Sequence, residues 1–145
     1  VVVEMPDSDR YQYLELPGAD TWGVLMPADH PLAAKAAIRA EDLYGQELIC
    51  SEHAAQVDIP RWCGAKADQL DITGTTNLAY NGSIFVREGL GLMLSFEHLI
   101  APSPENGLVF RPLEPGLQSK LYLIWRKYQI FSPIAQRLLD ALCAE

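Results

Sequence analysis

The chain has 145 residues, of which 49% are hydrophobic and 21% are charged, a composition typical of one globular domain and too apolar for an intrinsically disordered chain. Its net charge of -8 and isoelectric point of about 4.8 disfavour direct binding to nucleic acid, because an acidic surface repels the phosphate backbone. No apolar run reaches the length of a membrane span, so we expect no contact with a membrane.

The start of the chain predicts two extended segments. Residues 1–4 (V-V-V-E) have the character of a strand cut in its middle, with no initiator Met and no features of a signal peptide. We therefore expect the chain to be a piece of a longer protein. Residues 11–16 alternate in side-chain character and predict a second extended segment, which Pro17 and Gly18 end.

Two further strands are expected before residue 51. The continuous apolar run at 22–26 predicts a strand buried on both faces, as in a parallel sheet. Residues 29–45 predict short helical pieces, the last of which Gly45 is suited to end. Residues 47–50 predict the next strand.

The middle of the chain alternates between helices and strands. Residues 54–64 predict a helix with Pro60 in its first turn or at a break, ended by Gly64 and followed by a turn at 65–70. A strand is expected at 71–75. The clearest interior helix is expected at 77–88, with Asn77 as its N-terminal cap and Gly89 at its end. Later strands are expected at 90–96, 108–110 and 121–125.

The last element has the most complete helix signature. Ser132 is a capping residue and Pro133 suits the first helical position. The spacing of the apolar residues predicts a stripe on one face, formed by Ile134, Leu138, Leu139 and Leu142. The alternation of strands and helices along the chain predicts an α/β domain with a mostly parallel sheet flanked by helices.

The cysteines and histidines show no spacing that supports chemistry. The number of cysteines is odd, and no pair of them has metal-ligand or redox-motif spacing: they are Cys50, Cys63 and Cys143. This pattern predicts reduced thiols in the cytoplasm. The histidines are far apart along the chain. We therefore expect no metal site and no cofactor.

Catalytic residues are not expected either. Only at Cys50 do nucleophile-like groups crowd together, since Ser51, Glu52 and His53 follow it directly. A thiol nucleophile also requires a positioned base and a group that orients the base. We interpret Cys50 as a small hydrophobic residue at the end of a strand, and we expect no enzymatic activity.

Binding chemistry follows two of the predicted strands. Ser51 and Glu52 come directly after one strand, and Thr76 and Asn77 follow another. Ligands of open parallel sheets bind at the carboxyl ends of strands. The N-terminus of the helix after Asn77 also offers free backbone N–H groups to an anion. Helix capping is the alternative role of Thr76 and Asn77, and the two roles are compatible.

Three segments, in order, resemble the effector-binding domain of LysR-type transcriptional regulators. Residues 22–33 (W-G-V-L-M-P-A-D-H-P-L-A) are similar to its strand and H-P-L-A segment. Residues 81–92 (N-G-S-I-F-V-R-E-G-L-G-L) resemble its helix that leads through a G-L-G step into a strand. Residues 121–127 (L-Y-L-I-W-R-K) and 131–135 (F-S-P-I-A) are similar to its final crossing strand and C-terminal helix.

This resemblance implies a periplasmic-binding-protein type II-like fold, with two α/β lobes and a small-molecule effector in the cleft between them. The second lobe is expected at about 21–123, and remnants of the first lobe at 1–20 and 124–145. We expect this chain to lack the family's winged helix-turn-helix and most of the first lobe, so that DNA would be bound only through a missing N-terminal domain. We expect a homo-oligomer, or a rearranged C-terminus, to cover the apolar stripe of the last helix.

The resemblance and the strand ends together suggest the residues that line the second lobe's side of the cleft. Tyr80 would form an aromatic wall with a polar tip, and Phe96 would join from the end of its strand. Glu52 would favour a ligand with an amino group or another donor, although a solvated surface position is an equal alternative. The predicted effector-binding residues are Ser51, Glu52, Thr76, Asn77, Tyr80, Asn81 and Phe96.

Hinge residues are expected where the two lobes meet. Thr21 and Trp22 would lie at one crossing, and Ile124 and Trp125 at the other, with both tryptophans packing rather than stacking on a ligand.

The leading hypothesis is thus the sensor domain of a transcription regulator, which would modulate DNA binding by the full-length protein. One alternative is a transport-type solute-binding protein of the same fold. Another is a small α/β enzyme, such as a transferase or a prephenate-dehydratase-like module.

Overall fold

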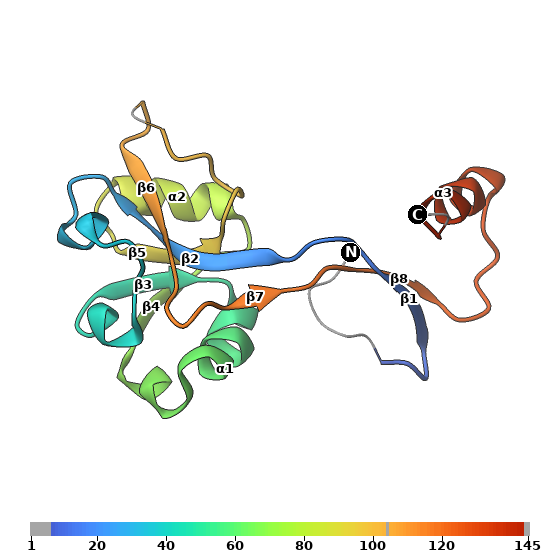
Figure 1. The fold of residues 1–145 in the computed structure, drawn as a ribbon, viewed down its shortest axis with the longest axis horizontal. Coiled ribbons are helices and arrows are strands. Elements are labelled where there is room, and N and C mark those ends of the chain that lie inside the picture. The colour runs from blue at the N-terminus through green and yellow to red at the C-terminus, as the bar shows by residue number, and fades with distance from the viewer. Residues whose placement is uncertain (1–6, 104, 144–145) are drawn as a thin grey trace. The chain divides into compact units, whose positions relative to one another are not determined.

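The computed structural model describes residues 7–103 and 105–143, so the strand predicted at 1–4 lies outside the described residues. The chain divides into two compact units (Figure 1). The larger unit comprises residues 21–118, and the smaller unit comprises residues 1–20 and 119–145. The expected second lobe begins at the same residue as the larger unit, whereas its expected end at 123 falls inside a strand of the smaller unit.

A mixed sheet forms the centre of the larger unit, in the order β4-β3-β5-β2-β6. Its strands are β2 (Asp20–Pro27), β3 (Glu47–Cys50), β4 (Asp71–Thr75), β5 (Leu92–Phe96), β6 (Leu108–Pro112) and the short β7 (Gln118–Ser119). The α/β class is confirmed. The sheet is only partly parallel, because β3 is parallel to β4 and β5 while β2 is antiparallel to β5 and β6.

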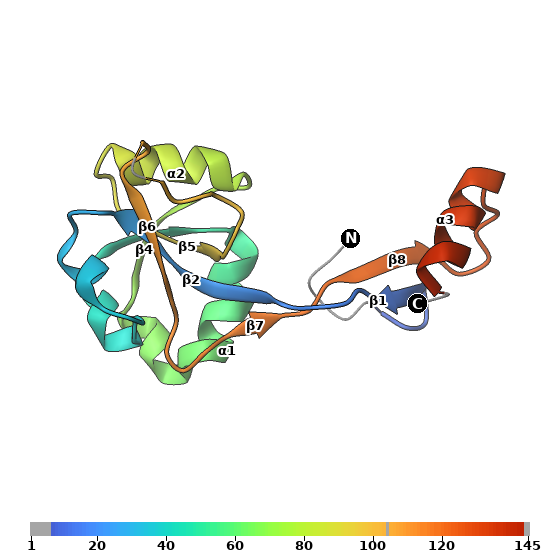
Figure 2. The same cartoon turned by 45° about the horizontal axis from the view of Figure 1, so that its top comes forward.

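Helices cover both faces of this sheet, as Figures 1 and 2 show for α1 and α2. The helical segments are η1 (Pro31–Ala34), η2 (Ala40–Leu43), the π-helical η3 (Ala54–Asp58), α1 (Ile59–Cys63), η4 (Gly64–Gln69) and α2 (Ala79–Arg87). The strand side chains alternate between the two faces. Val24 and Leu94 pack with the α1 side of the core, whereas Leu25 and Met93 pack with Val86 of α2.

Glycines set several boundaries, as predicted. Gly64 follows α1 with a φ of +57°, and Pro60 lies in the first turn of that helix. The strand expected at 90–96 begins only at Leu92, because Gly91 has a φ of +137° and cannot continue an extended strand.

The cap predicted for α2 is wrong. Leu78 occupies the N-cap position in an extended conformation, so Asn77 lies one residue too early to cap the helix. The Thr76 hydroxyl instead accepts a hydrogen bond from the Leu78 backbone N–H at 3.3 Å. The Asn77 side chain is therefore not used in capping.

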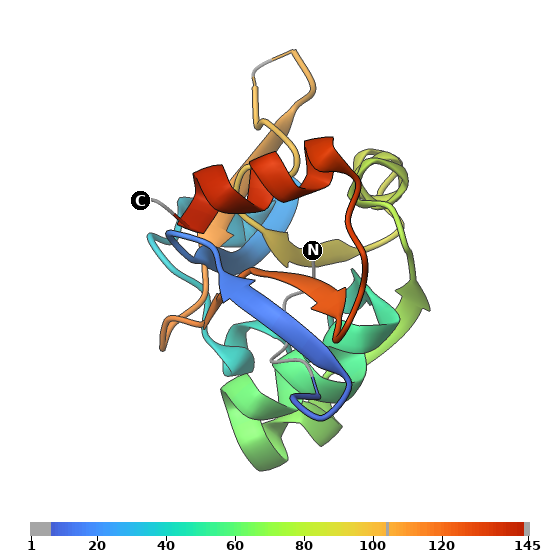
Figure 3. The ribbon, with the colours of Figure 1, turned by 90° about the vertical axis from the view of Figure 1, so that its right-hand side faces the viewer.

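The described residues of the smaller unit form an antiparallel pair of strands and one helix. β1 (Tyr11–Glu15) pairs with β8 (Tyr122–Arg126), as Figure 3 shows, and α3 spans Pro133–Cys143. Ser132 caps α3, since its hydroxyl accepts a hydrogen bond from the Ala135 N–H. Within the predicted apolar stripe, Leu139 is buried while Ile134 and Leu138 are exposed. No helix in the described parts of the chain is long and apolar enough to cross a membrane.

Candidate ligand-binding site

The carboxyl ends of β3 and β4 lie next to each other. The two strands are parallel, and Cys50 is in register with Thr75. The Thr76 N–H extends the pairing, because it donates a hydrogen bond to the Cys50 carbonyl at 2.9 Å. The polar residues that follow the two strands are thereby brought together at one edge of the sheet, as the sequence predicted.

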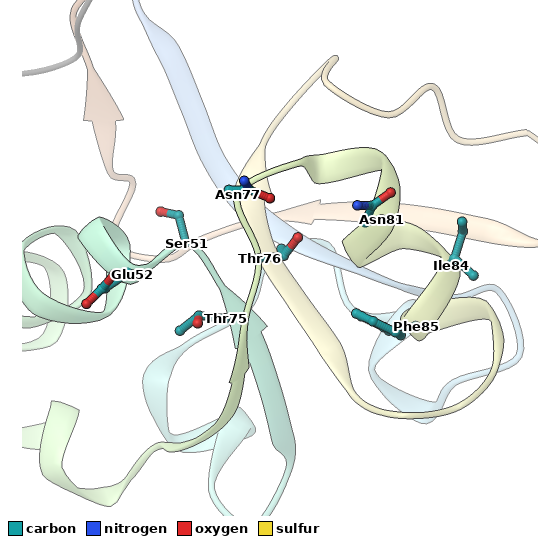
Figure 4. A pocket seen from close by; sticks show the side chains of 8 residues that line it. All are labelled: Ser51, Glu52, Thr75, Thr76, Asn77, Asn81, Ile84 and Phe85. Atoms are coloured by element: carbon teal, nitrogen blue, oxygen red, sulfur yellow. The ribbon is translucent and has the colours of Figure 1, made fainter.

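These strand ends and α2 line an open pocket of about 630 Å³, which we call the polar compartment (Figure 4). Its lining residues are Ser51, Glu52, Thr75, Thr76, Asn77, Asn81, Ile84 and Phe85. Five of the seven predicted effector-binding residues are among them. All of the lining residues belong to the larger unit.

Several side chains of the polar compartment retain hydrogen-bonding capacity. Ser51 Oγ accepts a hydrogen bond from the Ala54 N–H at 3.1 Å, so its own proton is available to a ligand. The Thr76 hydroxyl is engaged, because it also donates to the Leu78 carbonyl at 3.0 Å. Within residues 7–103 and 105–143, no hydrogen bond engages the side-chain amide of Asn77 or of Asn81. Each of these amides can both donate to and accept from a ligand.

Glu52 lies at the rim of the polar compartment. Its side chain is directed away from Thr76 and Asn77 in Figure 4, and Gln56 donates a hydrogen bond to its carboxylate at 3.4 Å. Glu52 is nevertheless the one residue lining this compartment, among those described, that carries a charge at neutral pH.

A second, smaller cavity of about 130 Å³ adjoins the first, and we call it the apolar compartment. It shares Ser51, Thr76 and Asn77 with the polar compartment, and its other lining residues are Trp22, Cys50, Ala79, Met93, Leu94, Ser95, Phe96 and Leu99. The Phe96 ring packs on Trp22 with their centroids 4.3 Å apart. Phe96 therefore lies in the apolar compartment rather than among the polar side chains.

Tyr80 lines neither compartment and is 69% exposed. The residues that the sequence prediction missed include Thr75, Ile84 and Phe85. Helical spacing was the signal for two of them, because Ile84 and Phe85 follow Asn81 by three and four residues and share its face. Tyr80 precedes Asn81 by one residue and so lies about 100° away around the helix.

The predicted hinge residues lie in both units. Trp22, which follows Thr21 at the start of the larger unit, is buried in its core. Ile124 and Trp125 lie in β8 and pair with Tyr13 and Gln12 of β1. The Trp125 indole N–H donates to Gln12 Oε1 at 2.9 Å. The hinge role of these four residues stays a prediction.

Cys50 is expected to be the least reactive of the three thiols. Burial raises the pKa of the Cys50 thiol to about 11, so it is protonated at neutral pH, and the thiolate is the nucleophilic form. Cys143 is exposed. After a short pulse of iodoacetamide at pH 8, mass spectrometry should find Cys143 alkylated and Cys50 unmodified. Early alkylation of Cys50 in the folded protein would contradict its burial.

The described residues also contain no group of three side chains suited to a metal ion.

A family model described as the LysR substrate binding domain matches residues 1–145, and the chain therefore belongs to this family. The resemblance seen in the sequence is confirmed. The comparison with curated proteins gave no match.

Solved structures show the same fold over nearly the whole chain, as three examples illustrate. The regulatory domain of CcmR from Synechocystis, in complex with 2-PG, has a TM-score of 0.77 and 21% identity, with 99% of this chain and 70% of that chain covered. The regulatory domain of MetR from N. meningitidis, a LysR family regulator, has a TM-score of 0.74 and 25% identity, with 99% and 65% covered. The effector-binding domain of QuiR in complex with shikimate has a TM-score of 0.78 and 18% identity, with 97% and 68% covered.

The periplasmic-binding-protein type II-like α/β fold expected from the sequence is thus confirmed. The chain spans about two thirds of the length of these three domains.

Proposed function

We propose that this chain is the ligand-sensing domain of a LysR-type transcription regulator and binds a small-molecule effector in the polar compartment. The observation that carries the proposal is the pair of unengaged amides, Asn77 and Asn81, which face a cavity at the carboxyl ends of two parallel strands. Two domains of the same fold, those of CcmR and QuiR, were solved with 2-PG and shikimate.

The family match favours sensing over the alternative functions. LysR regulatory domains belong to transcription regulators, so effector binding without turnover is the expected activity of this chain. A solute-binding protein of the same fold is the second candidate, but the match to the LysR model favours the regulator. We also propose that the full-length protein is a homo-oligomer in the cytoplasm. Its contact with DNA would be made by a separate domain.

Ligand binding should depend on the two asparagines. A thermal-shift screen of metabolites should give hits, because a ligand that binds only the folded state raises Tm. Asn77→Ala and Asn81→Ala should each weaken the hits roughly tenfold, through the loss of one or two hydrogen bonds. Calorimetric titration of each hit checks this expectation.

Gln69→Ala is the matched control, because Gln69 carries an exposed amide outside both compartments. Hits that bind all three variants equally well would locate the binding elsewhere and contradict the proposed function. Conversion of a hit to product during incubation would show an enzyme instead.

A further inference from the structure

The two compartments share three lining residues but differ in chemistry. Five of the eight residues that line the polar compartment carry a hydroxyl or amide group, whereas the apolar compartment is lined mainly by hydrocarbon and aromatic side chains. Ser51, Thr76 and Asn77 line both compartments, so a ligand held by one of these residues lies next to both. The chemistry of the two compartments therefore constrains the kind of effector that this unit recognises.

The apolar compartment is built from the core of the larger unit. Trp22 of β2 and Met93 of β5 are both buried, and the Phe96 ring packs against Trp22. Leu99, which follows β5, is 55% exposed and lies at the solvent side. Apolar cavities of roughly 150 Å³ accept benzene, so a volume of about 130 Å³ suits one ring or one branched alkyl group.

The charges around the site disfavour an anion. Among the described residues that line the two compartments, Glu52 alone is charged at neutral pH. The N-terminus of α2 contributes a partial positive charge of only about half an elementary charge, which is smaller than the full charge of a carboxylate. The net charge of -8 on the whole chain acts in the same direction.

We propose that the effector of this chain is a small amphipathic molecule with no net negative charge, whose compact apolar group occupies the apolar compartment while its hydrogen-bonding group contacts Asn77 and Asn81. This inference rests on the proposed function, since it specifies the ligand class of the same site.

Three probes test the ligand class on the whole chain. 3-Phenylpropanamide carries the apolar group and a neutral amide, propanamide lacks the ring, and 3-phenylpropanoate replaces the amide by an anion. Titration followed by NMR should show that 3-phenylpropanamide binds about tenfold more tightly than either of the others. Propanamide lacks the apolar contact of the ring, and 3-phenylpropanoate brings a negative charge into the site that contains Glu52. Equal affinities, tighter binding of 3-phenylpropanoate, or no binding of 3-phenylpropanamide would overturn the inference.

Variants assign each preference to a compartment. Leu99→Ser should weaken 3-phenylpropanamide about fivefold and leave propanamide unchanged, because it removes part of the apolar wall. Leu90→Ser is the matched control, since Leu90 is 56% exposed and lines neither compartment. An equal effect of the two substitutions would show that the ring does not enter the apolar compartment.

The charge preference is assigned to Glu52 in the same way. Glu52→Gln should raise the affinity for 3-phenylpropanoate about threefold, because a carboxylate that repels the anion is removed. Glu47→Gln, at the other end of β3, should leave it unchanged. If both variants bind the anion as the unmodified chain does, Glu52 does not select the ligand.

The metabolite screen separates this inference from the proposed function. Hits that require Asn77 and Asn81 but are anions or lack an apolar group would overturn the inference alone. If no hit requires these asparagines, the proposed function fails and the inference fails with it.

Discussion

Replacing Gly91 by alanine should lower the free energy of unfolding of the larger unit by roughly 3 kcal/mol. Gly91 has a φ of +137°, which residues with a Cβ rarely adopt, and a Cβ at this position would lie 2.7 Å from the Glu47 carbonyl oxygen. That oxygen is backbone, so relief of the clash requires a shift of the start of β3 or β5. Urea unfolding followed by far-UV circular dichroism measures the loss.

Gly89 provides the matched control for this substitution. It also has a positive φ, +76°, but no atom lies within 4 Å of the position that its Cβ would occupy. Gly89→Ala should therefore cost only the backbone strain of about 1 kcal/mol. An equal loss in the two variants would mean that the close approach of Gly91 to Glu47 does not limit the packing of the two strands.

The two glycines also explain the G-L-G step on which part of the family resemblance rests. Gly89 allows the chain to leave α2 with a positive φ, and Gly91 allows the backbone to pass close to Glu47 before β5 begins. The sequence indicated the end of the helix at this step. The close approach to Glu47 could not be predicted, because it depends on the pairing of β3 with β5.

Burial was predictable from the sequence, but strand direction was not. The apolar run at 22–26 indicated a strand buried on both faces, and β2 is such a strand. A parallel and an antiparallel central strand have the same apolar pattern when helices cover both faces. The antiparallel pairing of β2 with β5 and β6 is set by the connections around the sheet.

The candidate site was predictable where local rules apply. Ser51 and Thr76 follow strands that are parallel neighbours, so their proximity follows from the α/β pattern. Tyr80 was placed by its nearness in sequence to Asn77, whereas the orientation of a helical side chain depends on which face of the helix packs on the sheet. The division of the site into two compartments depends on packing between β2 and β5, which no local pattern reveals.

Loss of Trp22 should destabilise the larger unit strongly, because this residue belongs both to the core and to the apolar compartment. Its side chain is 4% exposed, packs within the main hydrophobic cluster and contacts the Phe96 ring. Trp22→Ala should lower the free energy of unfolding by about 3–5 kcal/mol, since it leaves a cavity that the surrounding sheet cannot fill. Urea unfolding should be followed by far-UV circular dichroism and not by fluorescence, because removing a tryptophan also changes the fluorescence signal.

Trp125→Ala compares the same chemical change in a different setting. Trp125 is half-buried in β8. Its replacement by alanine removes one hydrogen bond to Gln12 and an edge contact with Phe131. Its loss should cost about 1 kcal/mol. If Trp22→Ala proved no more costly than Trp125→Ala, Trp22 would not be a structural core residue. It would then be free to move with a bound ligand, and the apolar compartment would not be preformed.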